Sequence, residues 1–134
     1  MYTPKAFEVT DLARLHAAMK ESGLATLVTN GPGGLVATHL PLLLDESQGP
    51  FGTLRGHISR ANTQWKDFDP QAEALILFLG LDTYVTPNWY PAKQETGRVV
   101  PTWNYAAIHA YGRLQFFEDA ERLRAAAMLQ PDAR

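Results

Sequence analysis

The chain contains no cysteine, which excludes disulfides, thiol catalysis and metal sites with cysteine ligands. It also lacks a long apolar run, because its longest strongly apolar stretch, residues 74–79, is far shorter than the roughly 20 residues of a membrane helix. No basic segment followed by an apolar core stands at its start, so we expect no signal peptide. These absences predict a protein of the reducing cytoplasm without a membrane anchor.

The chain has no large excess of charge of either sign. Its 12 Lys and Arg and 14 Asp and Glu residues give a net charge of −2. Surfaces that hold duplex DNA are usually basic, so the charge does not favour DNA as a partner, although it is compatible with a local basic patch. With 134 residues, 46% of them hydrophobic, the chain is long enough to form one domain with its own core.

Common metal-binding and catalytic patterns are missing as well. The four histidines (His16, His39, His57 and His109) do not stand at ligand-pair spacings, and no carboxylate accompanies His39 or His57. We therefore expect no metal site. The sequence has no nucleophile elbow, P-loop or dinucleotide fingerprint, and it assigns no catalytic residue.

The secondary structure suggested by the sequence is mainly β with flanking helices. An early helix should begin after Thr10 or Asp11, bury a stripe of Leu12, Leu15 and Met19, and end at the Ser-Gly pair at 22–23. Strands are expected at residues 25–29, 35–44, 51–57, 74–79, 84–86 and 106–117, a short helix at 62–68, a charged loop at 93–97 and a last helix capped by Asp119. Six strands with one early and one late helix predict a small antiparallel barrel of the α+β class.

Polar and aromatic residues gather in four segments, at 37–41, 56–62, 87–90 and 100–105. The last contains Trp103 and Asn104. Asn is disfavoured in strands, and buried Trp and Asn both need hydrogen-bond partners. Such a segment is expected to face something flat with polar edges. A planar ligand and a second subunit are equally compatible with this composition.

The segment at 56–62 combines the donors that a phosphate requires. It places an imidazole (His57), a hydroxyl (Ser59) and a guanidinium (Arg60) where a strand ends and a short helix is expected to begin. Helix N-termini and arginine side chains both bind phosphate oxygens. The alternative is that Ser59 or Asn62 only caps the helix and Arg60 is solvated.

The segment at 37–41 contains a proline inside an otherwise regular strand. Pro41 lacks the N–H that a strand ladder uses, so the strand should be irregular there and can turn backbone groups of Thr38 and His39 towards a ligand. The alternatives are an ordinary edge strand and a structural histidine.

In their order along the chain, these segments resemble the PaiB-like family of FMN-binding negative transcriptional regulators. The resemblance extends over nearly the whole sequence. The matching stretches are 1–4, 23–29, 37–42, Gly56-His57 with Arg60-Ala61-Asn62, Gln64-Trp65, Trp89-Tyr90, 100–105 and 109–112.

The resemblance implies a six-stranded antiparallel split β-barrel, similar to pyridoxamine-phosphate-oxidase-like flavoproteins, that forms a homodimer with FMN in clefts between the subunits. It places three groups of residues around the cofactor. They are the phosphate-binding segment (His57, Ser59, Arg60, Ala61 and Asn62), the segment along the isoalloxazine ring (Thr38, His39, Leu40 and Pro41), and Trp103 and Asn104 at the border of the cleft.

The function that the resemblance implies is that of an FMN-binding regulator in which the flavin is a sensor or a structural ligand. Two alternatives are an FMN-dependent oxidoreductase of the split-barrel class and a cofactor-free dimeric interaction module. Haem is an alternative planar ligand. Because family members continue beyond the position of Arg134, we expect the last helix to be truncated within a single domain of residues 1–134.

Overall fold

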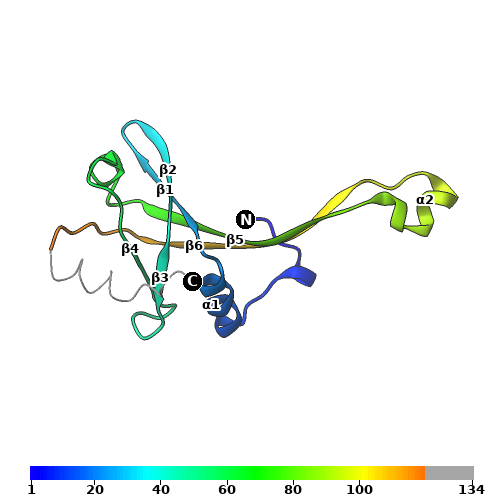
Figure 1. The fold of residues 1–134 in the computed structure, drawn as a ribbon, viewed down its shortest axis with the longest axis horizontal. Helices are drawn as coiled ribbons and strands as arrows, with labels where there is room; N and C mark the ends of the chain where they lie inside the picture. The colour runs from blue at the N-terminus through cyan, green and yellow to red at the C-terminus, as the bar shows by residue number, and fades with distance from the viewer. Residues whose placement is uncertain (120–134) are drawn as a thin grey trace.

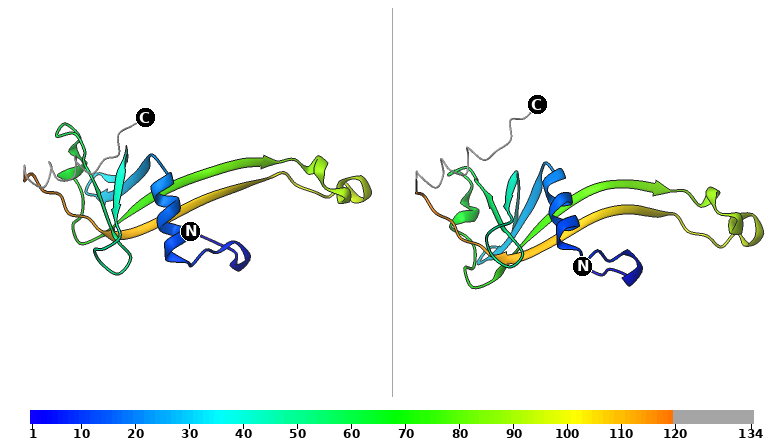
Figure 2. Two further views of the ribbon diagram at one scale, coloured as in Figure 1. Left: turned by 60° about the horizontal axis from the view of Figure 1, so that its bottom comes forward. Right: turned by 90° about the horizontal axis from the view of Figure 1, so that it is seen from below.

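A computed structural model describes residues 1–119 of the chain, and the structural statements below concern these residues (Figures 1 and 2). Most of them form strands. The strands are β1 (Ala25–Gly31), β2 (Gly34–Leu40), β3 (Leu42–Asp45), β4 (Thr53–Gly56), β5 (Glu73–Val85) and β6 (Thr102–Arg113); the helices are α1 (Leu12–Glu21) and α2 (Pro91–Thr96), with 3₁₀ turns η1 (Lys5–Phe7), η2 (Thr63–Trp65) and η3 (Pro87–Trp89).

The strands form two antiparallel sheets. One has four strands in the order β2-β1-β5-β6, and the other is the hairpin of β3 and β4. This arrangement confirms the predicted mainly β, antiparallel α+β class with flanking helices. Hydrogen bonding among the described strands does not join both sheets into one closed six-stranded barrel.

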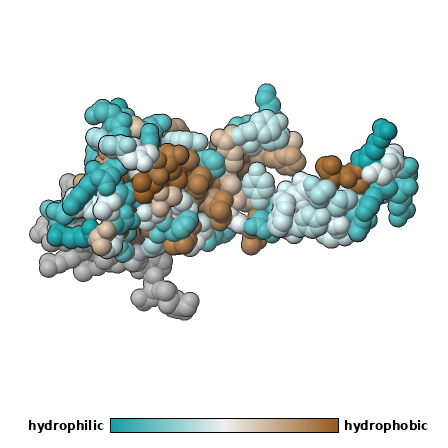
Figure 3. Space-filling view, turned by 90° about the horizontal axis from the view of Figure 1, so that it is seen from above, coloured by the Kyte–Doolittle hydropathy of each residue, from teal (hydrophilic) through white to brown (hydrophobic). Residues whose placement is uncertain are grey.

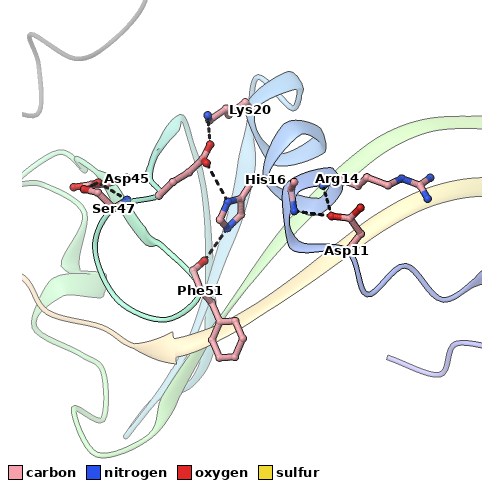
Figure 4. A network of polar contacts seen from close by, with 9 residues as sticks. Asp11, Arg14, His16, Lys20, Asp45, Ser47 and Phe51 are labelled. Carbon is pink, nitrogen blue, oxygen red and sulfur yellow. Dashed lines mark hydrogen bonds and ion pairs between the residues drawn. The ribbon is translucent and has the colours of Figure 1, made fainter.

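Helix α1 begins and ends where the sequence predicts. The Asp11 carboxylate accepts hydrogen bonds from the backbone N–H groups of Ala13 and Arg14 at 2.9 and 3.3 Å. Its most buried side chain is not in the predicted apolar stripe. It is His16, whose Nε2 lies 2.9 Å from the carbonyl oxygen of Phe51 in the β3–β4 loop (Figure 4).

A carboxylate in the β3–β4 loop, that of Glu46, also contacts α1. Glu46 forms an ion pair with Lys20 and lies 3.5 Å from Nδ1 of His16. The hydrogen bond and charge of Lys20, with a smaller effect of His16, hold the pKa of Glu46 below its ordinary value of 4.5. Polar groups on α1 therefore fasten the β3–β4 loop to the helix.

The lowered pKa of Glu46 predicts a pH-dependent contribution to stability. A carboxylate whose pKa is lowered by folding stabilises the fold above its unfolded-state pKa and loses this effect as the pH falls through its folded-state pKa. We expect Glu46→Gln to be slightly destabilising at pH 7 and less destabilising at pH 3, measured by urea unfolding. Glu21→Gln, at an exposed carboxylate at the end of α1, is the control. An equal effect of Glu46→Gln at both pH values would contradict the assignment.

Pro41 separates the two sheets. The single strand expected at 35–44 is divided there into β2, which pairs with β1, and β3, which pairs with β4. Since proline cannot donate a ladder hydrogen bond, the chain leaves the first sheet at this residue. The predicted irregularity at Pro41 is confirmed, and the prediction of one continuous strand was wrong.

Other predicted boundaries also need correction. The strands expected at 74–79 and 84–86 are one strand, β5, in which Gly80 and Leu81 together oppose Ala106 in a bulge. The helix expected at 62–68 is the single turn η2, and the loop expected at 93–97 lies largely in α2. The last predicted helix falls outside the described residues.

The core lies on the inner face of the four-stranded sheet, towards β3 and the segment after β4. Leu27, Leu40 and Ala74 are buried at its centre. Half-buried apolar residues surround them: Leu42, Ile58, Ile76, Leu114 and Phe116. Leu114 and Phe116 lie beyond the end of β6 and keep the alternation that the sequence predicted for residues 106–117.

The ribbon of β5 and β6 extends well beyond the rest of the sheet (Figures 1 and 2). β1 pairs with β5 only as far as Phe78, which lies opposite Ala25. From Leu79 to Ala107 the two strands continue alone, with η3 and α2 at the far end. We call residues 79–107 the arm. No helix in the described part of the chain is long and apolar enough to cross a membrane.

Candidate functional site

A cavity of about 660 Å³ lies between β4 and the segment that follows β6. Leu27, Leu40 and Ile76, on the inner face of the four-stranded sheet, contribute apolar groups to it. Residues 53–60 line it from the side of β4, and residues 113–118 line it from the opposite side. A volume of this size lies within the range of small-molecule and cofactor sites.

Part of the predicted phosphate-binding segment reaches this cavity. His57, Ser59 and Arg60 line it, and so does Leu40 of the predicted ring-binding segment. The guanidinium of Arg60 is highly exposed and lies 3.5 Å from the carboxylate of Glu118. Exposed ion pairs of this kind contribute little free energy, so a phosphate can replace Glu118 as the partner of Arg60 at small cost.

Ser59 and Asn62 also make the local hydrogen bonds of the alternative interpretation. The Ser59 hydroxyl accepts from the backbone N–H of Ala61 at 3.2 Å. The Asn62 side chain caps η2 by accepting from the backbone N–H of Gln64 at 3.0 Å. Neither Ala61 nor Asn62 is among the residues that line the cavity.

Asn62 joins two of the predicted segments. Its side-chain amide donates to the Thr38 hydroxyl at 2.8 Å, which ties the end of β2 to the turn that carries Arg60. Thr38 and Asn62 therefore hold the wall of the cavity in place, and neither lines the cavity itself.

Gln64 anchors the same turn from inside the fold. It is 1% exposed, the most buried large side chain described. Its amide nitrogen is 3.0 Å from the Thr29 hydroxyl, 3.2 Å from the carbonyl oxygen of Val36 and 3.4 Å from that of Leu27. The bonds fasten η2 to β1 and β2, and thereby position the preceding residues.

Trp65 and Arg55 line the cavity but were absent from the predicted site. The indole N–H of Trp65 donates to the carbonyl oxygen of Arg60 at 3.3 Å. Arg55 donates from Nη2 to the side chain of Gln48 at 2.6 Å, while its Nε is buried without a partner. A buried donor of this kind is costly unless an acceptor reaches it. The Gln-Trp pair at 64–65, one of the stretches that resemble the PaiB-like family, was a sequence signal for Trp65. No feature of the sequence distinguished Arg55.

The charge on the wall near β4 favours an anion. Arg55 is 3.5 Å from Asp45, whose pKa is lowered mainly by hydrogen bonds from Ser47 and to a smaller extent by Arg55 itself. This carboxylate balances part of the charge of Arg55, whereas Arg60 has only the weak exposed pair described above. Apolar groups beside arginine side chains are compatible with a planar ring that carries a phosphate.

Four predicted residues lie elsewhere in the described fold. His39 is exposed on the opposite face of β2 from Leu40, with its Nδ1 2.8 Å from the Thr26 hydroxyl. Pro41 is exposed at the corner between the sheets. Trp103 and Asn104 belong to the arm, where the Trp103 ring packs edge-on against Tyr84 at 5.7 Å. One chain therefore does not bring Trp103 and Asn104 to the cavity that Arg60 lines.

Several known proteins are similar to this sequence over most of its length. A protease synthase and sporulation protein PAI 2 of Bacillus subtilis is 35% identical over 121 residues, which cover 90% of this chain and 56% of that protein. An uncharacterized protein of Saccharomyces cerevisiae, YKL070W, is 29% identical over 89% of this chain and 80% of its own length. An uncharacterized protein of Emericella nidulans, AN0679, is 33% identical over 89% of this chain and 61% of its own length.

The chain thus spans little more than half the length of its Bacillus relative. The family model described as "Putative FMN-binding domain" matches residues 1–130. FMN, the cofactor predicted from the sequence, is the cofactor that this family is described as binding. The chain belongs to this FMN-binding family and, as its similarity to PAI 2 shows, to the PaiB-like group within it.

Proposed function

We propose that this protein binds FMN in the cavity beside β4 and acts as a negative transcriptional regulator of the PaiB type, with the flavin as a sensor or structural ligand. One observation carries the proposal: His57, Ser59 and Arg60, the side chains predicted for the phosphate, line the same cavity as apolar residues able to pack against a flat ring.

The proposed roles follow from the chemistry of the lining residues. Arg60 would bind two phosphate oxygens at once, and Ser59 and His57 would add single hydrogen bonds. Leu27, Leu40 and the other apolar groups would contact the isoalloxazine ring. When bound, FMN supplies one- or two-electron redox chemistry, while the protein orients the ring and sets its electrostatic surroundings.

The regulatory part of the proposal rests on the comparisons. The name of the Bacillus relative connects that protein with protease synthesis and sporulation, and such a connection is typical of a regulator. We further propose that residues 1–134 form one split-barrel domain of the pyridoxamine-phosphate-oxidase-like type, which works in the cytoplasm as a homodimer with FMN in the cleft between two copies.

An FMN titration of purified, cofactor-stripped protein tests the proposal. We expect saturable binding of about one FMN per chain, followed by flavin absorbance and tryptophan fluorescence. A folded chain that does not bind FMN would overturn it. Once FMN is loaded, rapid oxidation of NADH or NADPH would favour the oxidoreductase alternative, whereas FMN-dependent retention of a DNA fragment would favour the regulator.

A further inference from the structure

Trp65, at the end of η2, is the one tryptophan that lines the cavity among the described residues. The other two, Trp89 and Trp103, belong to the arm. The end of the body that carries η2 is mainly hydrophilic on the face shown in Figure 3. A half-buried indole at this place is therefore not explained by a surrounding apolar surface, and its role is to be sought in the cavity.

Two contacts fix the orientation of the Trp65 ring. Its indole N–H donates to the carbonyl oxygen of Arg60 at 3.3 Å. The ammonium group of Lys66 lies over one face of the ring, 4.6 Å from its centroid. With the N–H edge and one face occupied, the opposite face is the part of the ring that remains for a ligand. A side chain that is already ordered loses little conformational freedom when a ligand binds.

The bond from Trp65 to Arg60 also joins two parts of the proposed site. It links an aromatic ring to the residue expected to bind phosphate. Gln64, between them and the sheet, holds the turn to β1 and β2, so the spacing of the two positions is set by the fold. From the opposite wall, Leu114 and Phe116 supply apolar surface. A ligand with a flat ring at a fixed distance from a phosphate fits this arrangement.

We propose that Trp65 is the stacking platform of the cavity and that it binds oxidised FMN more tightly than reduced FMN. The inference rests on the proposed FMN function. Indole is an electron-rich ring and oxidised isoalloxazine an electron-poor one, whereas two-electron reduction makes the isoalloxazine electron-rich. Because the charge distribution of two rings governs how well they stack, Trp65 favours the oxidised form.

This preference gives the proposed sensor a physical basis. The protein retains its flavin most firmly when the flavin is oxidised, and holds it less firmly after reduction. Lys66 moderates the effect, because a cation over an aromatic ring is attracted to its electrons and makes the ring a poorer donor.

Absorbance spectra and titrations of Trp65→Leu test the inference. With oxidised FMN, the original protein should show a broad charge-transfer band beyond the main flavin absorption, and Trp65→Leu should lack it. Oxidised FMN should bind to Trp65→Leu about 10-fold more weakly, since stacking on an aromatic side chain contributes on this order. Reduced FMN, titrated without oxygen, should lose less than about threefold. The reduction potential of bound FMN should therefore rise.

Two further variants separate stacking from folding. Trp65→Phe keeps a ring without the N–H, so it should retain most of the affinity while its band moves to shorter wavelength, because a phenyl ring is a poorer donor than indole. Trp89→Leu, at an exposed tryptophan that does not line the cavity, should change neither the band nor the binding.

Lys66 provides a test of the opposite sign. Riboflavin is the probe here, because it lacks the phosphate that a lysine could attract directly. Lys66→Met should tighten oxidised riboflavin about twofold and move the band to longer wavelength, since the indole becomes a better donor. Lys66→Arg keeps the cation and should leave both unchanged.

The outcomes distinguish this inference from the proposed function. If FMN binds without a charge-transfer band, and Trp65→Leu weakens oxidised and reduced FMN equally, Trp65 is no platform and the inference is overturned, while the FMN function stands. If neither FMN nor riboflavin binds to the folded original protein, the proposed function fails and the inference fails with it.

Discussion

Replacing Arg60 with alanine should weaken FMN binding about 10- to 150-fold and leave riboflavin binding nearly unchanged. A hydrogen bond to a charged group contributes about 1.5–3 kcal/mol, and each 1.4 kcal/mol corresponds to a tenfold change in affinity. Riboflavin lacks the phosphate, so it gains nothing from the guanidinium. Titrations of both flavins into the original protein and the variant, followed by flavin fluorescence, measure the two ratios.

The design of this experiment separates binding from folding. The Arg60 side chain is 81% exposed and forms only an exposed ion pair with Glu118, so Arg60→Ala should leave the unfolding midpoint unchanged. Arg14→Ala, at an arginine of α1 that points away from the polar network of Figure 4 and does not line the cavity, is the matched control and should bind FMN normally. Arg60→Lys keeps the charge without the fork and should show an intermediate loss. Equal losses of FMN and riboflavin affinity in Arg60→Ala would show that the phosphate lies elsewhere.

The sequence predicted those parts of the fold that depend on local chemistry. Asp11 was recognised as a helix cap because its carboxylate can reach the free N–H groups of the next turn, and the structure shows both bonds. The Asn-Gly-Pro-Gly-Gly run at 30–34, between two predicted strands, is a strong turn signal, and the hairpin of β1 and β2 lies there. In each case the determining interaction spans only a few residues.

Features that depend on distant parts of the chain were not predictable in this way. The sequence predicted two strands, at 74–79 and 84–86, but Gly80 lies in a bulge within the single strand β5, where an added Cβ would stand 3.0 Å from that of Ala106. Pro41 marked an irregularity without revealing that the chain changes sheets there. Sequence periodicity identifies an apolar face, but it does not tell what covers that face, and the exposed arm is the clearest instance.

In the candidate site, too, the sequence predicted the local chemistry but not the contacts between distant residues. The segment at 57–62 contains the residue types that bind phosphate, and three of its polar side chains, His57, Ser59 and Arg60, line the cavity. Which residues face the cavity and which fasten the wall is decided by contacts over long sequence distances, such as Asn62 with Thr38. Arg55 was missed because an arginine inside a strand looks like an ordinary exposed residue until the opposite wall is known.

Replacing Gln64 should have the largest effect on stability. Gln64→Leu keeps the approximate volume but leaves the buried Thr29 hydroxyl and the partly buried carbonyl oxygen of Val36 without this donor. A buried polar group without a partner costs about 1–3 kcal/mol, so we expect a loss of about 2–4 kcal/mol in the free energy of unfolding, measured with urea. The FMN affinity of the folded fraction should fall as well, because the turn that carries Arg60 and Trp65 loses its anchor.

Gln64→Glu gives this prediction a dependence on pH that a mere change in packing would not produce. A carboxylate at this position would be buried beside the carbonyl oxygens of Leu27 and Val36, so its folded-state pKa should be raised. A group with a raised folded-state pKa loses stability as the pH rises, and Gln64→Glu should therefore be much less stable at pH 8 than at pH 5, relative to the original protein. Gln71→Glu, at an exposed glutamine, should show little difference between the two pH values. If Gln64→Glu behaves like Gln71→Glu, the Gln64 amide does not hold the wall of the cavity to the sheet, because a buried anchor cannot accept a charge without cost.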